Sequence, residues 1–141
     1  MIPALVLTAG LATRLRPLSL LRAKAVLPVA GVPLVRRILR ELHAAGVDDI
    51  VLNLHHLPET VARAVGDGSA DGVRVRYSWE VPLLGSGGGP RRAVPILGRS
   101  PFLVVNGDTL TDVSIAALVA DHEDNVAVVG AHRHCDGAAG R

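Results

Sequence analysis

Apolar runs alternate with amphipathic segments along this chain, and that alternation restricts its fold more than any other feature. Ile2–Thr8, Ile50–Leu54 and Phe102–Val105 are apolar runs with the length of buried strands. Pro33–Ala45 places Leu, Val and Ile at intervals of three and four residues and stops at Gly46, which predicts an amphipathic helix. Such alternation is typical of βαβ units, in which helices cover the faces of a parallel sheet.

The remaining segments fit the same pattern. Residues 73–79 alternate between apolar and polar side chains, which predicts a half-exposed edge strand. Three further helices and the start of a fifth strand are predicted at Pro58–Gly66, Arg91–Leu97, Ser114–His122 and Val126–Val129, and Pro95 is expected to bend or shorten its helix. Right-handed crossovers give the strand order 3-2-1-4. The sequence therefore predicts a Rossmann-like, three-layer α/β/α domain over residues 1–131 and a disordered tail over 132–141.

The composition limits the kind of protein this is. Aromatic residues make up only 2% of the chain, which disfavours nucleic-acid binding by base stacking, whereas 49% hydrophobic residues suit a core of aliphatic side chains. The single cysteine, Cys135, excludes an internal disulfide and favours a reducing compartment. No apolar run approaches the ~20 residues of a membrane helix, and the N-terminus lacks the features of a signal peptide. We therefore expect a cytoplasmic protein without a membrane partner.

Positive charge is concentrated at the start of the chain. The first forty residues hold seven basic residues and no Asp or Glu, whereas the remainder holds eight basic and 13 acidic residues. A local cluster of this kind favours a small phosphorylated ligand over a nucleic-acid polymer. Four of the seven follow the first strand and its glycine turn, namely Arg14, Arg16, Arg22 and Lys24. The other three, Arg36, Arg37 and Arg40, fall on the predicted solvent face of the Pro33–Ala45 helix, where nucleic-acid contact is the weaker interpretation.

Lys24 differs from its basic neighbours in its chemistry. It is the only lysine among 15 basic residues, which favours a site that needs a compact ammonium group rather than a planar guanidinium. The turn near it is neither a P-loop, because no G-x-x-x-x-G-K-[ST] motif is present, nor a dinucleotide fingerprint, because Ala12 and Leu15 stand where glycines are needed. A P-loop kinase and a dehydrogenase are therefore disfavoured.

The predicted strand order brings two distant segments together. The first and fourth strands are neighbours whose following connections diverge, and ligands bind at the carboxyl ends of strands beside such a switch point. Gly10 follows the first strand, and Asp108 follows the fourth. Asp after Asn106-Gly107 is also a common turn residue, but a phosphate-binding turn beside it favours a metal ligand.

Four segments, in order, resemble the sugar-1-phosphate nucleotidyltransferases, and most closely the mannose-1-phosphate guanylyltransferases. These segments are Leu7–Leu18, Lys24–Leu34, Glu80–Gly89 and Val104–Asp108, within a likeness that spans roughly residues 3 to 130. The resemblance implies transfer of a nucleoside monophosphate from an NTP, either GTP or UTP, to a sugar 1-phosphate, with release of pyrophosphate and with Mg²⁺ as cofactor. A sugar-phosphate uridylyltransferase and a non-catalytic nucleotide-binding module remain alternatives, and a basic nucleic-acid-binding domain is a third.

The resemblance also implies a role for individual residues. Arg14 would hold the β- and γ-phosphates, Lys24 would neutralise the α-phosphate or the sugar phosphate, and Asp108 would hold Mg²⁺; these three are the expected catalytic residues. The residues expected to bind the nucleotide are Leu7, Ala9, Gly10, Leu11, Ala12, Thr13, Arg14, Lys24, Gly85, Gly88 and Gly89. The segment Glu80–Gly89 resembles the family's base-binding loop.

The chain departs from the family pattern in several respects, and two of them bear on the site. Ala12 replaces a glycine that is common in the family's first loop, so the turn there either uses a permitted region or carries strain. The chain also ends just after the predicted fifth strand, whereas the later half of family members supplies the sugar pocket and a second metal-binding aspartate. We therefore expect either a truncated nucleotide-binding half or a partner chain, a second copy included, that supplies the rest.

Overall fold

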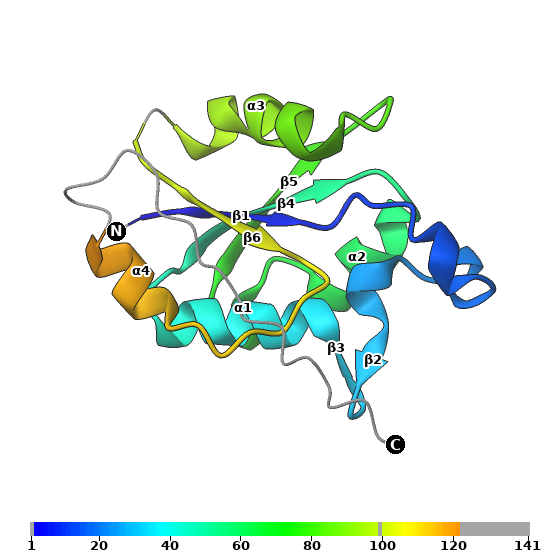
Figure 1. Cartoon of the computed structure of the whole chain (residues 1–141), viewed down its shortest axis with the longest axis horizontal. Coiled ribbons are helices and arrows are strands. Elements are labelled where there is room, and N and C mark those ends of the chain that lie inside the picture. Colours follow the sequence, from blue (N-terminus) through cyan, green and yellow to red (C-terminus); the bar gives the residue numbers. More distant parts are fainter. Residues whose placement is uncertain (1, 99, 122–141) are drawn as a thin grey trace, which may run out of the picture. The chain divides into compact units, whose positions relative to one another are not determined.

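A computed structural model describes residues 2–98 and 100–121 of the chain (Figure 1). The chain divides into two compact units, the first of which extends to Leu110. The second begins at Thr111, and its described part contains helix α4 (Ile115–Asp121). The predicted fifth strand at Val126–Val129 and the predicted tail at 132–141 lie outside the described residues.

The first unit is built on a four-stranded parallel sheet. Its strands lie in the order β5 (Arg74–Trp79), β4 (Asp49–Leu54), β1 (Ala4–Leu7) and β6 (Leu103–Asn106). This is the predicted order 3-2-1-4, and β5 lies at an edge as its alternating pattern predicts. The inner strands β1 and β4 are buried almost throughout, which explains why they are continuous apolar runs.

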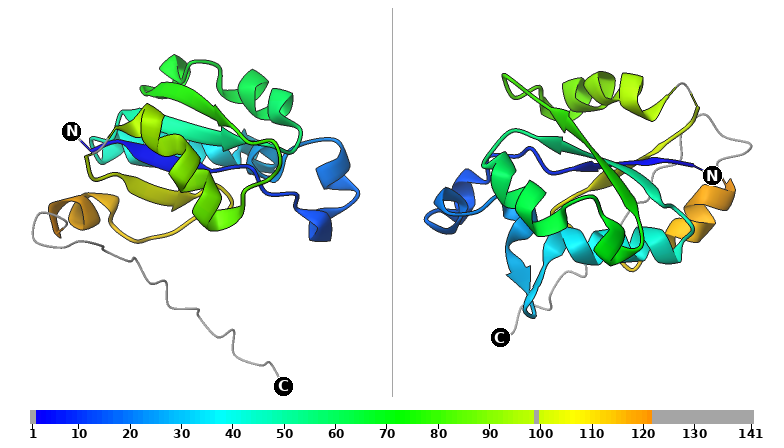
Figure 2. Two further views of the ribbon diagram at one scale, coloured as in Figure 1. Left: turned by 90° about the horizontal axis from the view of Figure 1, so that it is seen from above. Right: turned by 180° about the vertical axis from the view of Figure 1, so that it is seen from behind.

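Helices cover both faces of this sheet, so the predicted three-layer α/β/α architecture is confirmed (Figures 1 and 2). α1 (Leu34–Ala44) and α2 (Pro58–Val65) lie on one face, and α3 (Gly85–Leu97) lies on the other. Leu5 of β1 and Val51 of β4 pack against Ala93 and Leu97 of α3. Burial of these aliphatic side chains is the main stabilising contribution to the sheet–helix contact.

The long connection between β1 and α1 carries the basic residues. It contains three short 3-10 helices and a two-stranded hairpin: η1 (Thr13–Leu15), η2 (Leu18–Leu20), η3 (Lys24–Val26), β2 (Pro28–Val29) and β3 (Val32–Pro33). A fourth 3-10 helix, η4 (Ser69–Asp71), follows α2. Because this connection begins and ends next to the sheet, its side chains can return to the carboxyl ends of the strands.

The glycine-rich segment is helical rather than a loop, which corrects the prediction that the helix begins at Arg91. α3 begins at Gly85 and continues through Pro90 and Pro95 to Leu97. Pro95 therefore does not end the helix, although it removes one main-chain donor. Packing of the buried Ala93 and Leu97 on the sheet outweighs the poor helix propensity of the glycines and prolines.

Three of the seven N-terminal basic residues have structural partners and do not contribute to a phosphate site. Arg36 donates two hydrogen bonds to the carboxylate of Asp71, at 2.8 and 3.0 Å, and Arg40 donates a third at 2.7 Å. Arg37 donates to the carbonyl oxygens of Val29 and Ala30. The helix face predicted to be simply solvated therefore holds η4 and the β2–β3 hairpin against α1.

Asp71→Asn is expected to lower the free energy of unfolding at neutral pH by about 2 kcal/mol, because it weakens charge-assisted hydrogen bonds at a buried acceptor. Burial raises the pKa of Asp71, but the hydrogen bonds from Arg36 and Arg40 outweigh burial and hold the pKa below its ordinary value. A depressed folded-state pKa stabilises the protein above the unfolded pKa of about 3.9 and loses that contribution as the pH falls through the folded value.

Urea unfolding between about pH 7 and pH 2.5 measures both effects, since the pH range brackets the unfolded pKa. The stability difference between wild type and Asp71→Asn should shrink as the pH falls below about 4. Glu41→Gln, which changes an exposed carboxylate on α1, is the matched control and should follow the wild-type profile. Parallel profiles for wild type and Asp71→Asn would show that the Arg–Asp cluster does not stabilise the fold.

Candidate functional site

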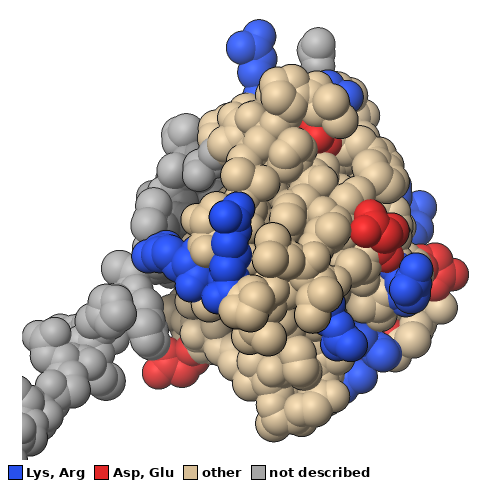
Figure 3. All heavy atoms as spheres, turned by 90° about the vertical axis from the view of Figure 1, so that its right-hand side faces the viewer, with Lys and Arg blue, Asp and Glu red and all other residues tan. Residues whose placement is uncertain are grey.

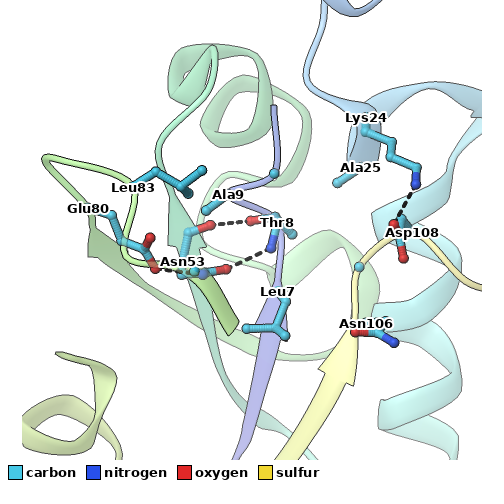
Figure 4. A pocket seen from close by; sticks show the side chains of 13 residues that line it. Leu7, Thr8, Ala9, Lys24, Ala25, Asn53, Glu80, Leu83, Asn106 and Asp108 are labelled. Carbon is cyan, nitrogen blue, oxygen red and sulfur yellow. Dashed lines mark hydrogen bonds and ion pairs between the residues drawn. The ribbon is translucent and has the colours of Figure 1, made fainter. Parts of the chain in front are cut away.

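A pocket opens at the carboxyl edge of the sheet and is lined by residues at the ends of β1, β4 and β6 and by Glu80, which follows β5 (Figure 4). Its floor is formed by the end of β1 and the turn that follows it, Leu7 to Gly10. The other lining residues are Lys24, Ala25, Asn53, Glu80, Leu83, Gly85, Asn106, Gly107 and Asp108. Lys24 and Asp108 lie at one end of the pocket, and Glu80 and Leu83 lie at the other (Figure 4).

Lys24 and Asp108 form an ion pair at the charged end. Lys24 Nζ lies 2.5 Å from Asp108 Oδ2, although the two residues are 84 positions apart. The two side chains are 35% and 40% exposed, so both can reach a ligand. Burial raises the pKa of Asp108, but hydrogen bonds from Lys24 and Thr109 outweigh it and hold the pKa below 3.8. Asp108 is therefore a carboxylate at neutral pH.

Gly107 places Asp108 close to the end of β1. Its N–H donates to the carbonyl oxygen of Leu7 at 3.0 Å. A Cβ atom on Gly107 would approach Thr8 Cγ2 to 2.9 Å and would also meet the main chain of Leu7. A residue without a side chain is therefore required where β6 turns over β1.

Two hydrogen bonds anchor the segment before Lys24 to the region around α2. The N–H of Ala23 donates to Thr60 Oγ1 at 3.1 Å. His56 Nε2 lies 2.6 Å from the carbonyl oxygen of Ser19, and because a carbonyl only accepts, the ring nitrogen is the donor. These contacts explain how an irregular connection presents Lys24 at a defined position.

A buried polar network connects the strands at the other end of the pocket. Asn53 accepts a hydrogen bond from the N–H of Thr8 and donates one to Glu80, and Glu80 accepts another from the N–H of Leu84. Thr8, Asn53 and Glu80 are at most 5% exposed. Thr8, Asn53 and Glu80 are not among the predicted site residues, although Glu80 opens the segment that resembles a base-binding loop and Asn53 interrupts an otherwise apolar strand.

The structure brings only some of the predicted site residues to the pocket. Those that line it are Leu7, Ala9, Gly10, Lys24, Gly85 and Asp108. Leu11, Ala12, Thr13 and Arg14 belong to the following turn and η1, and they are not among the lining residues. Gly88 and Gly89 also fall outside the lining, because they face Leu84 and the Glu80–Asn53 contact from inside α3. Of the predicted base-binding glycines, only Gly85 faces the pocket.

Ala12 has a left-handed backbone conformation, with φ 50° and ψ 42°, at the start of η1. The sequence leaves two possibilities for this turn, a permitted backbone conformation or a strained one, and the structure has the strained one.

Ala12→Gly is expected to raise the free energy of unfolding by about 0.5–1 kcal/mol, because relief of left-handed strain exceeds the entropic cost of glycine. Ala64→Gly within helix α2 should lower it by about 1 kcal/mol. Thermal and urea unfolding measure the free energy of unfolding of both variants. An equal loss of stability in Ala12→Gly and Ala64→Gly would show that the backbone at Ala12 is not strained.

The distribution of charged and metal-binding side chains limits the ligands that can bind near Lys24 and Asp108. In the view of Figure 3 the Lys and Arg side chains form separate groups, and those on the right lie beside Asp or Glu side chains. Over residues 2–98 and 100–121, no group of three or more His, Cys, Asp or Glu side chains is arranged to hold a metal ion. A metal at Asp108 would therefore need oxygen atoms from a ligand. Within the same residues, no helix is long and apolar enough to cross a membrane.

Comparison with known proteins gives close relatives over most of the chain. An N-acetylmuramate α-1-phosphate uridylyltransferase of Neisseria meningitidis serogroup B is 46% identical over 115 residues, which cover 81% of this chain and 50% of that protein. A mannose-1-phosphate guanylyltransferase of Mycobacterium tuberculosis is 38% identical over 128 residues, which cover 91% of this chain and 36% of that protein. The chain thus spans half or less of the length of these relatives.

A solved structure and a family model agree with these relatives. The crystal structure of HddC from Yersinia pseudotuberculosis complexed with GMP-PN has a TM-score of 0.77 and 27% identity, and the match covers 88% of this chain and 55% of that one. The family model for nucleotidyl transferases matches residues 3–134. The chain therefore belongs to the nucleotidyl transferase family, as its four sequence segments predict.

Proposed function

We propose that the pocket binds a nucleoside triphosphate and that the protein transfers the nucleoside monophosphate to a sugar 1-phosphate, with release of pyrophosphate. The observation that carries this proposal is the contact of Lys24 with Asp108 at the junction of β1 and β6. An ammonium group and a carboxylate at this position can neutralise phosphate oxygens and hold a divalent cation, respectively. The opposite end of the same pocket offers Leu83 and Gly85 to a base.

The proposed reaction is an in-line displacement at the α-phosphorus. An oxygen of the sugar phosphate attacks, the bond between the α-phosphorus and the bridging oxygen to the β-phosphate breaks, and pyrophosphate leaves with the electron pair. Negative charge grows on the non-bridging and leaving oxygens, so catalysis requires positioned positive charge. Lys24 is assigned to the α-phosphate or the sugar phosphate. Arg14, which is exposed on η1, is assigned to the β- and γ-phosphates.

Asp108 is the proposed ligand of Mg²⁺. Mg²⁺ often binds through one or two carboxylates, phosphate oxygens and water, so a single carboxylate facing the pocket suits it. The cation would add charge neutralisation to that of Lys24. The second oxygen of the carboxylate accepts a hydrogen bond from Thr109 at 3.0 Å, which orients the group.

The nucleotide and the sugar differ among the relatives. Their names include a guanylyltransferase and a uridylyltransferase, so the proposal covers GTP and UTP, with mannose 1-phosphate and N-acetylmuramate 1-phosphate as acceptors. The nucleotide-binding domain is assigned to residues 1–131. Because this chain spans at most half of those relatives, the sugar pocket is assigned to residues outside it, in the same protein or in a partner chain. The substrates and the single cysteine support a cytoplasmic location.

The test has two parts. Calorimetric titration of each NTP is carried out on the 141-residue chain, and a pyrophosphate-release assay, with GTP or UTP each paired with both sugar phosphates, is carried out on that chain together with the residues or the partner that supply the sugar pocket. We expect NTP binding that requires Mg²⁺ and release that requires both Mg²⁺ and one sugar 1-phosphate. Chelation by EDTA should abolish both. NTP binding without release would favour a non-catalytic nucleotide-binding module. Failure to bind any NTP would overturn the proposal.

A further inference from the structure

We propose that Asn53 is a positioning residue that aligns the base end of the pocket through Glu80. This inference rests on the proposed function, because it assigns the end of the pocket near Glu80 to the nucleotide base. Asn53 contacts neither charged residue of the opposite end, as Figure 4 shows. The proposed role of the Asn53–Glu80 contact is therefore in recognition of the base, whereas Lys24 and Asp108 are assigned to the phosphates and the metal ion.

The hydrogen bonds of Asn53 connect the ends of three strands. Asn53 Oδ1 accepts from the N–H of Thr8 at 2.7 Å, and the carbonyl oxygen of Asn53 accepts from Thr8 Oγ1 at 2.5 Å. Asn53 Nδ2 donates to Glu80 Oε1 at 2.7 Å. One amide side chain thus ties the end of β4 to the residue after β1 and to the residue after β5.

Glu80 connects Asn53 to the start of α3. Its second oxygen, Oε2, accepts from the N–H of Leu84 at 3.0 Å, immediately before the helix begins at Gly85. A Cβ atom on Gly89 would lie 2.6 Å from Glu80 Oε1 and 2.9 Å from Asn53 Nδ2, so the helix packs directly on this contact. Any shift of Glu80 must therefore move the first turn of α3, where Gly85 lines the pocket.

The chemistry at each position is restricted by the direction of the hydrogen bonds. Glu80 faces two donors, Asn53 Nδ2 and the N–H of Leu84, so both of its oxygens must accept. Glu80→Gln would leave its amide nitrogen facing one of these donors. Asn53→Asp would place two carboxylate oxygens against each other in a buried site. Each single change leaves a buried polar group without a suitable partner.

The two changes together restore a complete network with reversed direction. In the Asn53→Asp/Glu80→Gln double variant, the amide nitrogen introduced at position 80 can donate to the carboxylate introduced at position 53. The amide oxygen can still accept from Leu84, and the carboxylate can still accept from Thr8. The double variant has the same net charge and nearly the same volume as the wild type. The two proteins therefore differ in the direction of the hydrogen bond between the side chains at positions 53 and 80.

The experiment measures affinities for the NTP that binds the wild type and for inorganic tripolyphosphate, both with Mg²⁺. We expect each single variant to bind the NTP about tenfold or more weakly, because one buried hydrogen bond is replaced by a repulsive contact. Tripolyphosphate affinity should change less than about twofold, and the double variant should recover most of the NTP affinity. The structural control is Val65→Ala, a truncation of a buried side chain at the end of α2, which should leave both affinities unchanged.

Three results would overturn the inference. Wild-type NTP affinity in both single variants would show that the network does not align the base end. Equal losses for NTP and tripolyphosphate would show a general structural role. A double variant no better than the single variants would contradict the proposed hydrogen-bond polarity. In contrast, a wild-type protein that binds no NTP would remove the proposed function itself, and this inference with it.

Discussion

Lys24→Ala is expected to lower the rate of nucleotidyl transfer about 10²–10³-fold, which is the usual effect of removing one preorganised contact to a transition-state oxyanion. The ammonium group lies in the pocket beside Asp108 and, in the proposed reaction, would neutralise charge that grows during displacement at phosphorus. Lys24→Arg should recover little of the rate, because a guanidinium presents a planar fork of donors where the pocket holds a compact ammonium group.

The pyrophosphate-release assay measures this loss, with Arg63→Ala as the matched control. Arg63 is exposed on α2 and does not line the pocket, so its replacement removes the same charge without touching the site. Its rate should stay within about twofold of wild type, because distant exposed charges are screened by salt. Equal rates for wild type and Lys24→Ala would remove Lys24 from the reaction.

Gly107→Ala is expected to lower the free energy of unfolding by about 2–3 kcal/mol, because the added methyl group is forced against the main chain of Leu7 and against Thr8. The neighbouring main chain belongs to β1 at the centre of the sheet and cannot move without breaking its pairing with β6. Because Asp108 follows directly, its carboxylate should also leave the position beside Lys24. Affinity for Mg²⁺ with NTP should therefore fall together with stability.

Gly87→Ala provides the control for this prediction. A Cβ atom on Gly87 meets nothing within 4 Å, and Gly87 lies in α3 with no positive φ. The same chemical change should there raise stability by about 1 kcal/mol, because alanine is the better helix former. Urea unfolding compares the two variants. A neutral effect of Gly107→Ala would mean that the turn after β6 does not approach β1 closely.

Most of the fold can be predicted from the sequence because the signals are local. Each strand of the sheet is a short apolar or alternating run, and the handedness of the crossovers limits their order. The start of α3 is different, since nothing local in Gly85–Gly89 favours a helix. Contacts made elsewhere decide it: Glu80 accepts the N–H of Leu84, and Ala93 is buried on the sheet.

The candidate site shows the same division between local and distant signals. Lys24 and Asp108 can be found from residue type and from the topology of the sheet, which predicts that the ends of the first and fourth strands meet. The pairing of Arg36 and Arg40 with Asp71 spans 35 and 31 positions, and the Asn53–Glu80 contact spans 27. Neither has a recurring spacing that a sequence pattern could reveal, so the sequence predicts a solvated helix face where Arg36 and Arg40 bind Asp71.

The most direct test of the proposed site is a crystal structure of the protein with Mg²⁺ and a non-hydrolysable analogue of GTP or UTP. The account predicts the triphosphate beside Lys24, the metal ion on the carboxylate of Asp108, and the base against Gly85 at the far end of the same pocket. A nucleotide bound on another surface, or one with its base beside Lys24 and its phosphates beside Gly85, would contradict it.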